Sequence, residues 1–282
     1  MSLLIERAGP LTTVQDLGRP GYAHLGVPRA GALDQPALRL ANRLVGNPED
    51  AAGLELTLGG FTARLTRAGT VALTGACAPL RVDGRPAPLG APVPVPAGAR
   101  IEVGAAVVGL RPYLAVDGGI DVAPVLGSRS TDTLAWLGPP VVKDGTTLPL
   151  GPATEPSTVD VAPCGQVGEL RLRVRLGPRA DWFTDEALEL LFCGQYQISN
   201  DSNRVGTRLV GAALPRAVAG ELESEGIVLG AVQVPASGQP LVFLADHPTT
   251  GGYPVIGVVD AADLPALAQA RPGEKVRFHG SQ

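Results

Sequence analysis

Residues Glu221–Pro254 read ELESEGIVLGAVQVPASGQPLVFLADHPTTGGYP and carry the strongest structural signal in the chain. Two apolar runs, Ile227–Val234 and Leu241–Ala245, flank the turn residues Pro235–Gly238. Valine and isoleucine favour the pleated, half-buried surface of a sheet, and proline and glycine between the runs prevent a continuous helix. The stretch therefore predicts a buried β-hairpin.

Polar side chains surround this hairpin at high density. A polar group left without a partner at the end of a buried strand costs roughly 1–3 kcal/mol. So many of them together indicate a ligand site, a partner interface or a large internal network, although the turn residues of an ordinary β-turn would give a similar composition. The group comprises Glu221, Glu223, Ser224, Glu225, Gln233, Gln239, Asp246, His247, Thr249, Thr250 and Tyr253.

Composition extends the β interpretation to the rest of the chain. Its 282 residues can bury a large core and favour two domains over one. The 37 glycines and 27 prolines suit many short strands and tight turns better than long helices. The segment Leu148–Val159 is rich in Pro and Thr and has no periodicity. We therefore expect an all-β protein with a few short helices, an N-terminal domain over residues 1–150 and a C-terminal domain over residues 151–282.

Charge and motifs exclude several classes of protein. A formal net charge of −4 offers no basic surplus for a nucleic-acid backbone. Neither Lys143 nor Lys275 belongs to a P-loop, and no G-x-S-x-G esterase elbow occurs. The N-terminus lacks a signal-peptide core, and no apolar run of about 20 residues is present. We expect a cytoplasmic protein that binds neither nucleic acid nor a membrane.

The cysteines and histidines argue against a metal site. Cys77, Cys164 and Cys193 are odd in number, widely spaced and form no C-x-x-C pair, which fits a reducing compartment. The three histidines add no short cluster with metal-ligand spacing. We expect no bound metal and interpret each cysteine as a small buried hydrophobe.

Three short helices are predicted from capping residues and apolar spacing. Asp34 is placed to accept from the first free N–H groups of the helix that follows it, and this role is favoured over that of a catalytic acid. Thr184 and Asp263 are placed in the same way for the helical patterns Trp182–Phe192 and Asp263–Ala270. We expect all three side chains to act as helix N-caps.

Two further patterns predict strands in the N-terminal half. The Asp83–Gly84 pair is typical of a type I′ turn and predicts a tight hairpin. Between Leu54 and Leu58, leucine alternates with Glu55 and Thr57, which predicts one buried and one polar face. The region is therefore expected to form a barrel or a sandwich.

An arginine in a glycine-rich loop is a candidate for binding an anion. Arg129 stands between Ser128 and Ser130 in the run GSRSTD, where its guanidinium, the hydroxyls and open backbone N–H groups suit a carboxylate or a phosphate. The alternative is that Arg129 braces its own loop through Asp121 or Asp132.

Three other arginines would likewise either bind an anion or pair with an acid of the same chain. Arg19 lies close to Asp16 in a glycine-rich loop, where the two side chains would form a structural brace or part of a site. Arg204 and Arg208 are evenly spaced along a predicted strand and are expected to share a face. Their charges would repel unless an anion, or an acid such as Glu223, lies opposite.

A series of motifs runs from about Leu3 to Phe278 and comprises GPLTTVQDLGRPGY, GVPRAGALD, LANRLVGN, YLAVDGGIDVAPVLGSRSTD, SNRVGTRL, ESEGIVLGAVQVP, SGQPLVFLADHPTTGGYP and PGEKVRF. In this order the motifs resemble those of the KipA-like, biotin-dependent carboxyltransferase-related family. Its members include the C subunit of 5-oxoprolinase, the KipI antagonist and one part of the carboxyltransferase region of urea amidolyase. The resemblance is specific for the family and much less specific for an activity.

The resemblance implies two cyclophilin-like β-barrel domains and partner chains similar to the B and A subunits of 5-oxoprolinase. It implies a component that helps to open the 5-oxoproline lactam to glutamate at the expense of ATP, which would be bound within the complex. Two alternatives stay open. The chain would be a noncatalytic antagonist that binds a KipI-like inhibitor of a sensor kinase, or a carboxyltransferase half that accepts carboxybiotin.

The expected site residues follow from this function and from the polar loops. Opening an unstrained amide requires stabilisation of an oxygen that gains charge, which arginines and backbone N–H groups provide. Asp246 is the candidate general base, although a structural carboxylate would fit the sequence as well. The predicted anion holders are Arg129, Ser130, Arg204 and Arg208, and the predicted substrate hydrogen bonders are Gln233, Gln239 and Tyr253.

Overall fold

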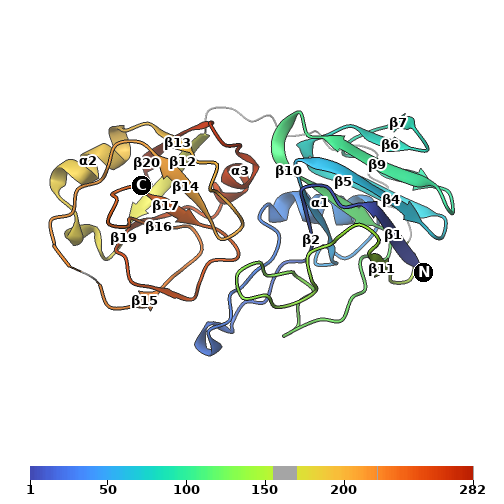
Figure 1. Cartoon of the computed structure of the whole chain (residues 1–282), viewed down its shortest axis with the longest axis horizontal. Coiled ribbons are helices and arrows are strands. Elements are labelled where there is room, and N and C mark those ends of the chain that lie inside the picture. The colour runs from blue at the N-terminus through green and yellow to red at the C-terminus, as the bar shows by residue number, and fades with distance from the viewer. Residues whose placement is uncertain (155–169, 221, 282) are drawn as a thin grey trace. The chain divides into compact units, whose positions relative to one another are not determined.

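The computed structural model describes residues 1–154, 170–220 and 222–281. The chain divides into two units (Figure 1). Unit 1 comprises Met1–Arg19, Ala30–Asp132 and Trp136–Gln166, and unit 2 comprises Pro20–Arg29, Thr133–Ala135 and Val167–Gln282. Two short pieces of the N-terminal half therefore belong to unit 2. The boundary predicted at residue 150 lies close to residues 155–169, which are outside the described part, and stays a prediction.

Unit 1 consists of two antiparallel sheets (Figure 1). The six-stranded sheet has the order β11 (Thr147–Pro149), β1 (Ser2–Arg7), β4 (Gly59–Leu65), β9 (Arg100–Ala105), β6 (Leu80–Val82) and β7 (Arg85–Ala87). The five-stranded sheet has the order β2 (Leu11–Gln15), β3 (Gly53–Thr57), β10 (Val108–Val116), β5 (Gly69–Cys77) and β8 (Val93–Val95). Alternate side chains of both sheets meet in one apolar core, which includes Leu3, Phe61, Ile101, Leu54, Leu73 and Leu114.

Helix α1 (Gln35–Leu44) packs on the five-stranded sheet and buries its second face. The Asp34 carboxylate accepts a hydrogen bond from Ala37 N at 3.0 Å, so the predicted N-cap is confirmed. Because of this helix, the predicted polar face of β3 is wrong: Glu55 is 1% exposed. Leu58, predicted to be buried, lies beyond the end of the strand and is 41% exposed.

Glu55 is stabilised in the core by a network of hydrogen bonds. Its Oε2 accepts from Tyr113 Oη at 2.7 Å and from Leu33 N at 3.0 Å, while Tyr113 Oη accepts from Asp34 N at 2.8 Å. The Arg111 guanidinium lies 3.7 Å from the other carboxylate oxygen. Burial, together with the nearby Glu55 charge, raises the pKa of the Tyr113 hydroxyl well above its ordinary value. The network joins the start of α1 to the sheet beneath it.

Tyr113→Phe is expected to lower the free energy of unfolding by roughly 1–3 kcal/mol, because it removes one donor to Glu55 and the acceptor of Asp34 N. Urea denaturation of the full chain measures the loss. Tyr22→Phe is the matched control, since Tyr22 lies outside this network. Equal stability of the Tyr113 variant and the wild type would show that this network contributes nothing.

Unit 2 closes into a barrel of seven strands (Figure 1). Around the barrel these are β12 (Leu170–Leu176), β19 (Val255–Val259), β16 (Ala231–Gln233), β17 (Leu241–Phe243), β14 (Gly206–Val210), β13 (Tyr196–Ile198) and β20 (Lys275–Gly280). The parallel pair of β12 and β20 closes it, and the other neighbours are antiparallel. A separate two-stranded sheet joins β15 (Glu225–Gly226) to β18 (Thr250–Gly251). The all-β prediction with a few short helices is confirmed.

The two hairpins predicted from turn residues are both present. Strands β16 and β17 pair antiparallel across the Pro235–Gly238 turn, although each is shorter than its apolar run. Strands β6 and β7 pair across Asp83–Gly84, where φ is +48° and +75° as a type I′ turn requires. Glu221, the first residue of the polar group around the main hairpin, lies outside the described residues.

The remaining helices confirm one of two predicted caps. Helix α2 (Asp185–Cys193) begins after Thr184, whose hydroxyl accepts from Ala187 N. Helix α3 (Leu264–Gln269) follows Asp263, which makes no side-chain cap bond, so that prediction is wrong. The Asp263 carboxylate instead accepts from Arg173 N at 2.7 Å and from the Arg173 guanidinium, which lowers the pKa of Asp263. The Asp263 carboxylate therefore binds Arg173 of β12 instead of capping α3.

The cysteines of the described chain are not all buried. The prediction of buried cysteines is wrong for Cys193, which is exposed at the end of α2, and Cys77 is half-buried. Cys164 lies outside the described residues. Among the helices that the structure describes, none has the length and apolar composition needed to cross a bilayer.

Candidate functional site

Asp16 anchors the loop that carries the predicted anion holders of unit 1. Asp16 follows β2, and its carboxylate accepts hydrogen bonds from Ser128 Oγ at 2.6 Å, Arg129 N at 2.6 Å, Ser130 Oγ at 2.5 Å and Gly18 N at 2.8 Å. Ser128 and Ser130 are fully buried. One carboxylate thus shapes a loop more than 100 residues further along the chain.

This geometry gives Ser130 and Arg129 different surroundings. The Ser130 hydroxyl donates a hydrogen bond to the Asp16 carboxylate and accepts one from Asp16 N. Both hydrogen bonds hold the loop in shape. The Arg129 guanidinium donates to Val122 O at 2.8 Å and pairs with Asp121 at 2.9 Å, while its side chain stays 36% exposed. The loop brace through Asp121 is therefore present, and part of the guanidinium faces solvent. Substrate binding by both residues stays a prediction.

Arg19 supports the same loop by a different route from the predicted one. Its guanidinium donates to Ser130 O and to Val125 O, both backbone carbonyls. The predicted pairing of Arg19 with Asp16 is wrong, because the hydroxyls and backbone N–H groups of the loop occupy the Asp16 carboxylate among the residues described. The Arg19 side chain is 1% exposed.

Arg204 and Asp246 form a buried ion pair in unit 2. Arg204 Nε and Nη2 each lie 3.0 Å from one oxygen of the Asp246 carboxylate, and the two residues are 2% and 0% exposed. Asp246 Oδ2 also accepts from Thr133 N at 2.9 Å and from Thr133 Oγ1 at 2.7 Å. The pair therefore fixes the Thr133–Ala135 segment, which lies in unit 2. The predicted roles of Arg204 and Asp246 in substrate binding and base catalysis stay predictions.

Arg208 and Gln239 are placed apart from this pair. The prediction that Arg208 shares a face with Arg204 is wrong, because Arg204 precedes β14, which begins only at Gly206. Arg208 is exposed on that strand. Gln239 accepts from Gly211 N at 2.8 Å and donates to Gly211 O at 3.1 Å, which fixes the turn between two strands.

A cavity of about 420 Å³ lies beside the main hairpin of unit 2. It is lined by residues 213–220 and by the Pro235–Gly238 turn, and among the described residues that line it Arg216 alone is charged. Arg216 Nη2 donates to Val234 O at 2.6 Å, and the guanidinium carbon lies 5.9 Å from the centre of the Tyr253 ring. These two contacts orient the cation in the wall of the cavity.

Two of the predicted substrate binders lie next to Arg216. Gln233 Nε2 donates to Tyr253 O at 3.0 Å, which ties β16 to the Thr-Thr-Gly-Gly-Tyr segment. Tyr253 is 45% exposed, and its hydroxyl makes no hydrogen bond to the residues that the structure describes. Arg216 likewise pairs with no carboxylate within that part of the chain. A half-buried guanidinium that pairs with no carboxylate among the described residues can bind the carboxylate of a ligand.

Arg216 and Arg29 were both missed by the sequence reasoning. Arg29 is half-buried, and its burial lowers the pKa of its guanidinium. No carboxylate pairs with Arg29 in the described ranges 1–154, 170–220 and 222–281. The only sequence signal was the position of each arginine in a Pro-containing run, VPRAG and LPRAV, that lacks a neighbouring acid. That signal is shared by many structural arginines.

No metal site accompanies these clusters in the described part of the chain, where no three His, Cys, Asp or Glu side chains gather in a way that holds a metal ion.

Comparison with known proteins places the chain among carboxyltransferase-related proteins. A family model described as carboxyltransferase domain, subdomain A and B, matches residues 25–280. The chain is 42% identical over 279 residues to the C subunit of 5-oxoprolinase from Escherichia coli (strain K12), covering 98% of this chain and 90% of that protein. It is 34% identical over 275 residues to the C subunit of 5-oxoprolinase from Haemophilus influenzae, covering 94% and 87%.

Urea amidolyases contain a similar region within much longer chains. The chain is 33% identical over 299 residues to urea amidolyase of Saccharomyces cerevisiae, which covers 97% of this chain but 16% of that protein. The crystal structure of Kluyveromyces lactis urea amidolyase matches with a TM-score of 0.93 at 29% identity, covering 100% of this chain and 19% of that one. The chain thus spans less than a fifth of the urea amidolyases that it resembles.

Proposed function

Because the chain belongs to the family of carboxyltransferase domains with subdomains A and B, we propose that it is the C subunit of an ATP-dependent 5-oxoprolinase. In this role it acts with A-type and B-type chains to open the 5-oxoproline lactam to glutamate. The observation that carries the proposal is the two-way coverage: nearly all of this chain aligns with nearly all of two bacterial C subunits.

The cavity beside Arg216 supports a site for this substrate in unit 2. At neutral pH, 5-oxoproline carries a carboxylate, which the Arg216 guanidinium binds through charge-assisted hydrogen bonds. In this proposal the Tyr253 hydroxyl is a donor for the lactam oxygen while it gains charge: the Tyr253 ring lies 5.9 Å from the guanidinium carbon, and buried Gln233 holds the Tyr253 backbone by donating to its carbonyl. The cavity volume falls in the range of small-molecule sites.

The other predicted site residues have supporting roles in the proposal. Asp246 positions Arg204 and Thr133, and Ser130 holds the Asp16 loop in shape. Arg129, Arg208 and Gln239 reach solvent and remain candidate contacts for the anionic groups of the reaction.

ATP is assigned to another chain of the complex. The phosphates of ATP require a cation and backbone N–H groups in a cradle. Lys143 and Lys275 are both exposed and follow no glycine-rich loop that leads into a helix. The described residues of this chain do not fit a P-loop nucleotide site, and in this proposal a partner chain binds ATP.

Carboxyl transfer from carboxybiotin is the second candidate, and the similarity to urea amidolyase favours it. The same anion-holding residues would then bind the carboxyl group that is transferred. This activity requires a biotin carrier as well.

The experiment is a titration of 5-oxoproline into the purified chain, with and without the A-type and B-type chains, while ATP hydrolysis and glutamate release are measured. We expect turnover only in the mixture of all three chains. A complex that assembles and hydrolyses no ATP with 5-oxoproline would contradict the proposal and favour an antagonist. Carboxylation by carboxybiotin in place of lactam opening would favour the second candidate.

In that complex, Arg216→Ala is expected to raise KM for 5-oxoproline about ten- to hundred-fold with little change in kcat, because a charge-assisted hydrogen bond contributes about 1.5–3 kcal/mol to ground state and transition state alike. Arg216→Lys keeps the charge and is expected to recover part of the affinity. Arg175→Ala is the matched control, since Arg175 is exposed on β12 away from the cavity. An unchanged KM in the Arg216 variant would remove this cavity from the proposed site.

A further inference from the structure

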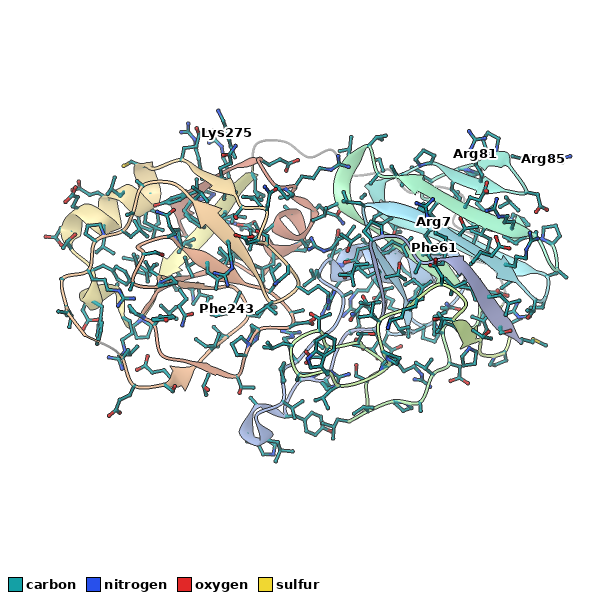
Figure 2. The ribbon with its side chains drawn as sticks, in the orientation of Figure 1. Arg7, Phe61, Arg81, Arg85, Phe243 and Lys275 are labelled. Atoms are coloured by element: carbon teal, nitrogen blue, oxygen red, sulfur yellow. The ribbon has the colours of Figure 1, made fainter. Side chains whose placement is uncertain are left out.

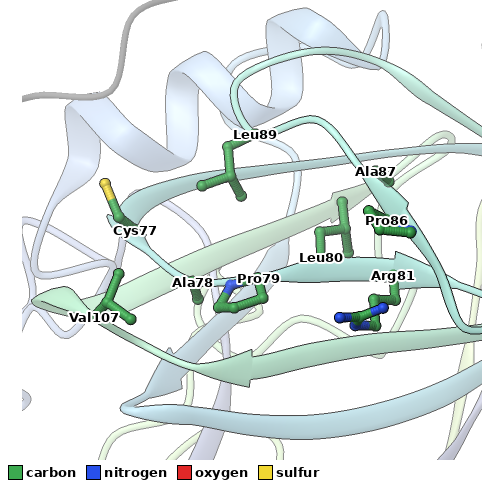
Figure 3. Close-up of a pocket in the computed structure, with 9 residues that line it drawn as sticks. All are labelled: Cys77, Ala78, Pro79, Leu80, Arg81, Pro86, Ala87, Leu89 and Val107. Carbon is green, nitrogen blue, oxygen red and sulfur yellow. The ribbon is translucent and has the colours of Figure 1, made fainter.

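A second cavity, of about 350 Å³, opens at one edge of unit 1 (Figure 3). Its wall is mainly apolar and includes Cys77, Pro79, Pro86, Leu89 and Val107. The cavity lies at the end of the six-stranded sheet, where β7 is the last strand, and Cys77 ends β5 of the other sheet. No substrate-binding or catalytic residue predicted above lines it.

Prolines at this edge prevent another chain from pairing as an added strand. β7 contains Pro86 and is followed by Pro88, and β8, the last strand of the five-stranded sheet, contains Pro94. Because proline has no N–H to donate, these strands cannot extend the ladder in a regular way. A partner at this edge must bind through its side chains.

Exposed apolar side chains continue from the mouth of the cavity. Val107 is 68% exposed, and Val108, the next residue, is 44% exposed. Leu58 is 41% exposed and lies beside them, because its carbonyl accepts from Ala106 N at 2.9 Å. Exposed apolar residues at the mouth of an apolar cavity are what a surface that binds a partner would offer.

Two arginines lie on the β6–β7 hairpin, and one of them, Arg81, lines the cavity. Arg81 lines it and donates to Gly84 O at 3.0 Å, and Arg85 stands on the other strand of the β6–β7 hairpin (Figure 2). Neither pairs with a carboxylate in the part of the chain that the structure describes, whereas Arg64 and Arg100 on the same sheet both pair with Glu6. The hairpin also carries Asp83, and Glu102 lies opposite Arg81 on β9, where it pairs with Arg100. With two arginines against one aspartate, the hairpin keeps one positive charge in excess.

We propose that this edge of unit 1, defined by Cys77, Arg81, Arg85, Leu89 and Val107, is the docking surface for a partner chain of the proposed complex. The partner contributes a short segment with an apolar side chain that enters the cavity and carboxylates that pair with Arg81 and Arg85. The positive charge of the hairpin favours a partner segment with carboxylates. The prolines at the edge prevent that segment from pairing as an added β-strand. This inference rests on the proposed function for the existence of the partner.

Charge reversal tests the electrostatic half of the proposal. Arg81→Glu is expected to weaken binding of the A-type or B-type chain at least about tenfold, because it places a carboxylate opposite those of the partner. The wild-type affinity is expected to fall as salt rises, and the variant is expected to lose that dependence. The matched control is Arg7→Glu: Arg7 is exposed and lies on β1, with β4 and β9 between it and β6. Its affinity is expected to match the wild type.

Apolar contact is tested at Val107. Val107→Asp is expected to weaken the same binding at least about tenfold, because a carboxylate at the mouth of the cavity opposes both the apolar side chain and the charge of the partner. Val228→Asp is the control, since Val228 is 55% exposed in a loop of unit 2. Both variants change surface residues, and circular dichroism checks that they fold.

Cys77 provides a second measurement that needs no substitution. Alkylation by N-ethylmaleimide, read for each cysteine by peptide mass spectrometry, is expected to slow at Cys77 about tenfold or more when the partner binds. Cys193 is exposed in unit 2 and is the internal control, whose rate is expected to stay the same.

The outcomes separate this inference from the proposed function. If the complex assembles and turns over, but Arg81→Glu and Val107→Asp bind normally and Cys77 stays reactive, this docking surface is wrong and the proposed function stands. If the isolated chain self-associates and Arg81→Glu makes it monomeric, the surface joins two copies and the partner assigned here is wrong. If neither partner binds the wild-type chain, both proposals fail.

Discussion

Asp246→Ala is expected to lower the free energy of unfolding by about 3–5 kcal/mol, because it leaves the Arg204 guanidinium buried without its carboxylate. The same change removes the acceptor of both Thr133 hydrogen bonds. Urea denaturation followed by tryptophan fluorescence measures the loss, since Trp182 lies in unit 2. Asp246→Asn keeps one acceptor and is expected to lose less.

Asp201→Ala is the control for this experiment, because Asp201 is exposed in a turn of the same unit and its substitution is expected to stay within about 0.5 kcal/mol of the wild type. A loss below about 1 kcal/mol in Asp246→Ala would show that the ion pair contributes little. Normal stability combined with lost turnover in the complex would instead support the prediction that Asp246 is a general base.

Asp16→Ala is expected to lower the free energy of unfolding by roughly 3 kcal/mol, because four donors lose their acceptor and two of them are the buried hydroxyls of Ser128 and Ser130. Thermal unfolding measures the loss of stability. Amide hydrogen exchange is expected to be faster at Gly18 and Arg129, whose N–H groups donate to Asp16.

Asp50→Ala is the matched control, since Asp50 is an exposed carboxylate of unit 1. If Asp16→Ala unfolds at the temperature of this control and the exchange rates at Gly18 and Arg129 do not change, the carboxylate does not organise the loop.

Features that depend on neighbouring residues were predicted well. The caps at Asp34 and Thr184 and the turn at Asp83–Gly84 each act within three residues of chain, so the local sequence contains both the donor and the acceptor. The pairing of β16 with β17 depends on apolar runs and one turn, and it was predicted for the same reason.

Features that depend on distant residues were predicted poorly. Glu55 was expected to face solvent because the alternation of β3 does not show that α1 covers the second face. Asp263 has the position of a cap, yet Arg173, 90 residues earlier, binds its carboxylate. Thr133 reaches Asp246 across 113 residues. The sequence of a polar loop shows that its groups need partners and does not show which ones.

Unit 2 cannot be released from the N-terminal half by one cut. Pro20–Arg29 and Thr133–Ala135 are encoded far upstream of the strands of its barrel. A fragment that begins after residue 150 would lack Thr133. Asp246 Oδ2 would then lose the two hydrogen bonds that Thr133 donates to it. A C-terminal fragment is therefore incomplete, and a fragment of unit 2 that keeps these contacts has to include the upstream segments as well. The match to urea amidolyases likewise covers both units together, at 97% of this chain.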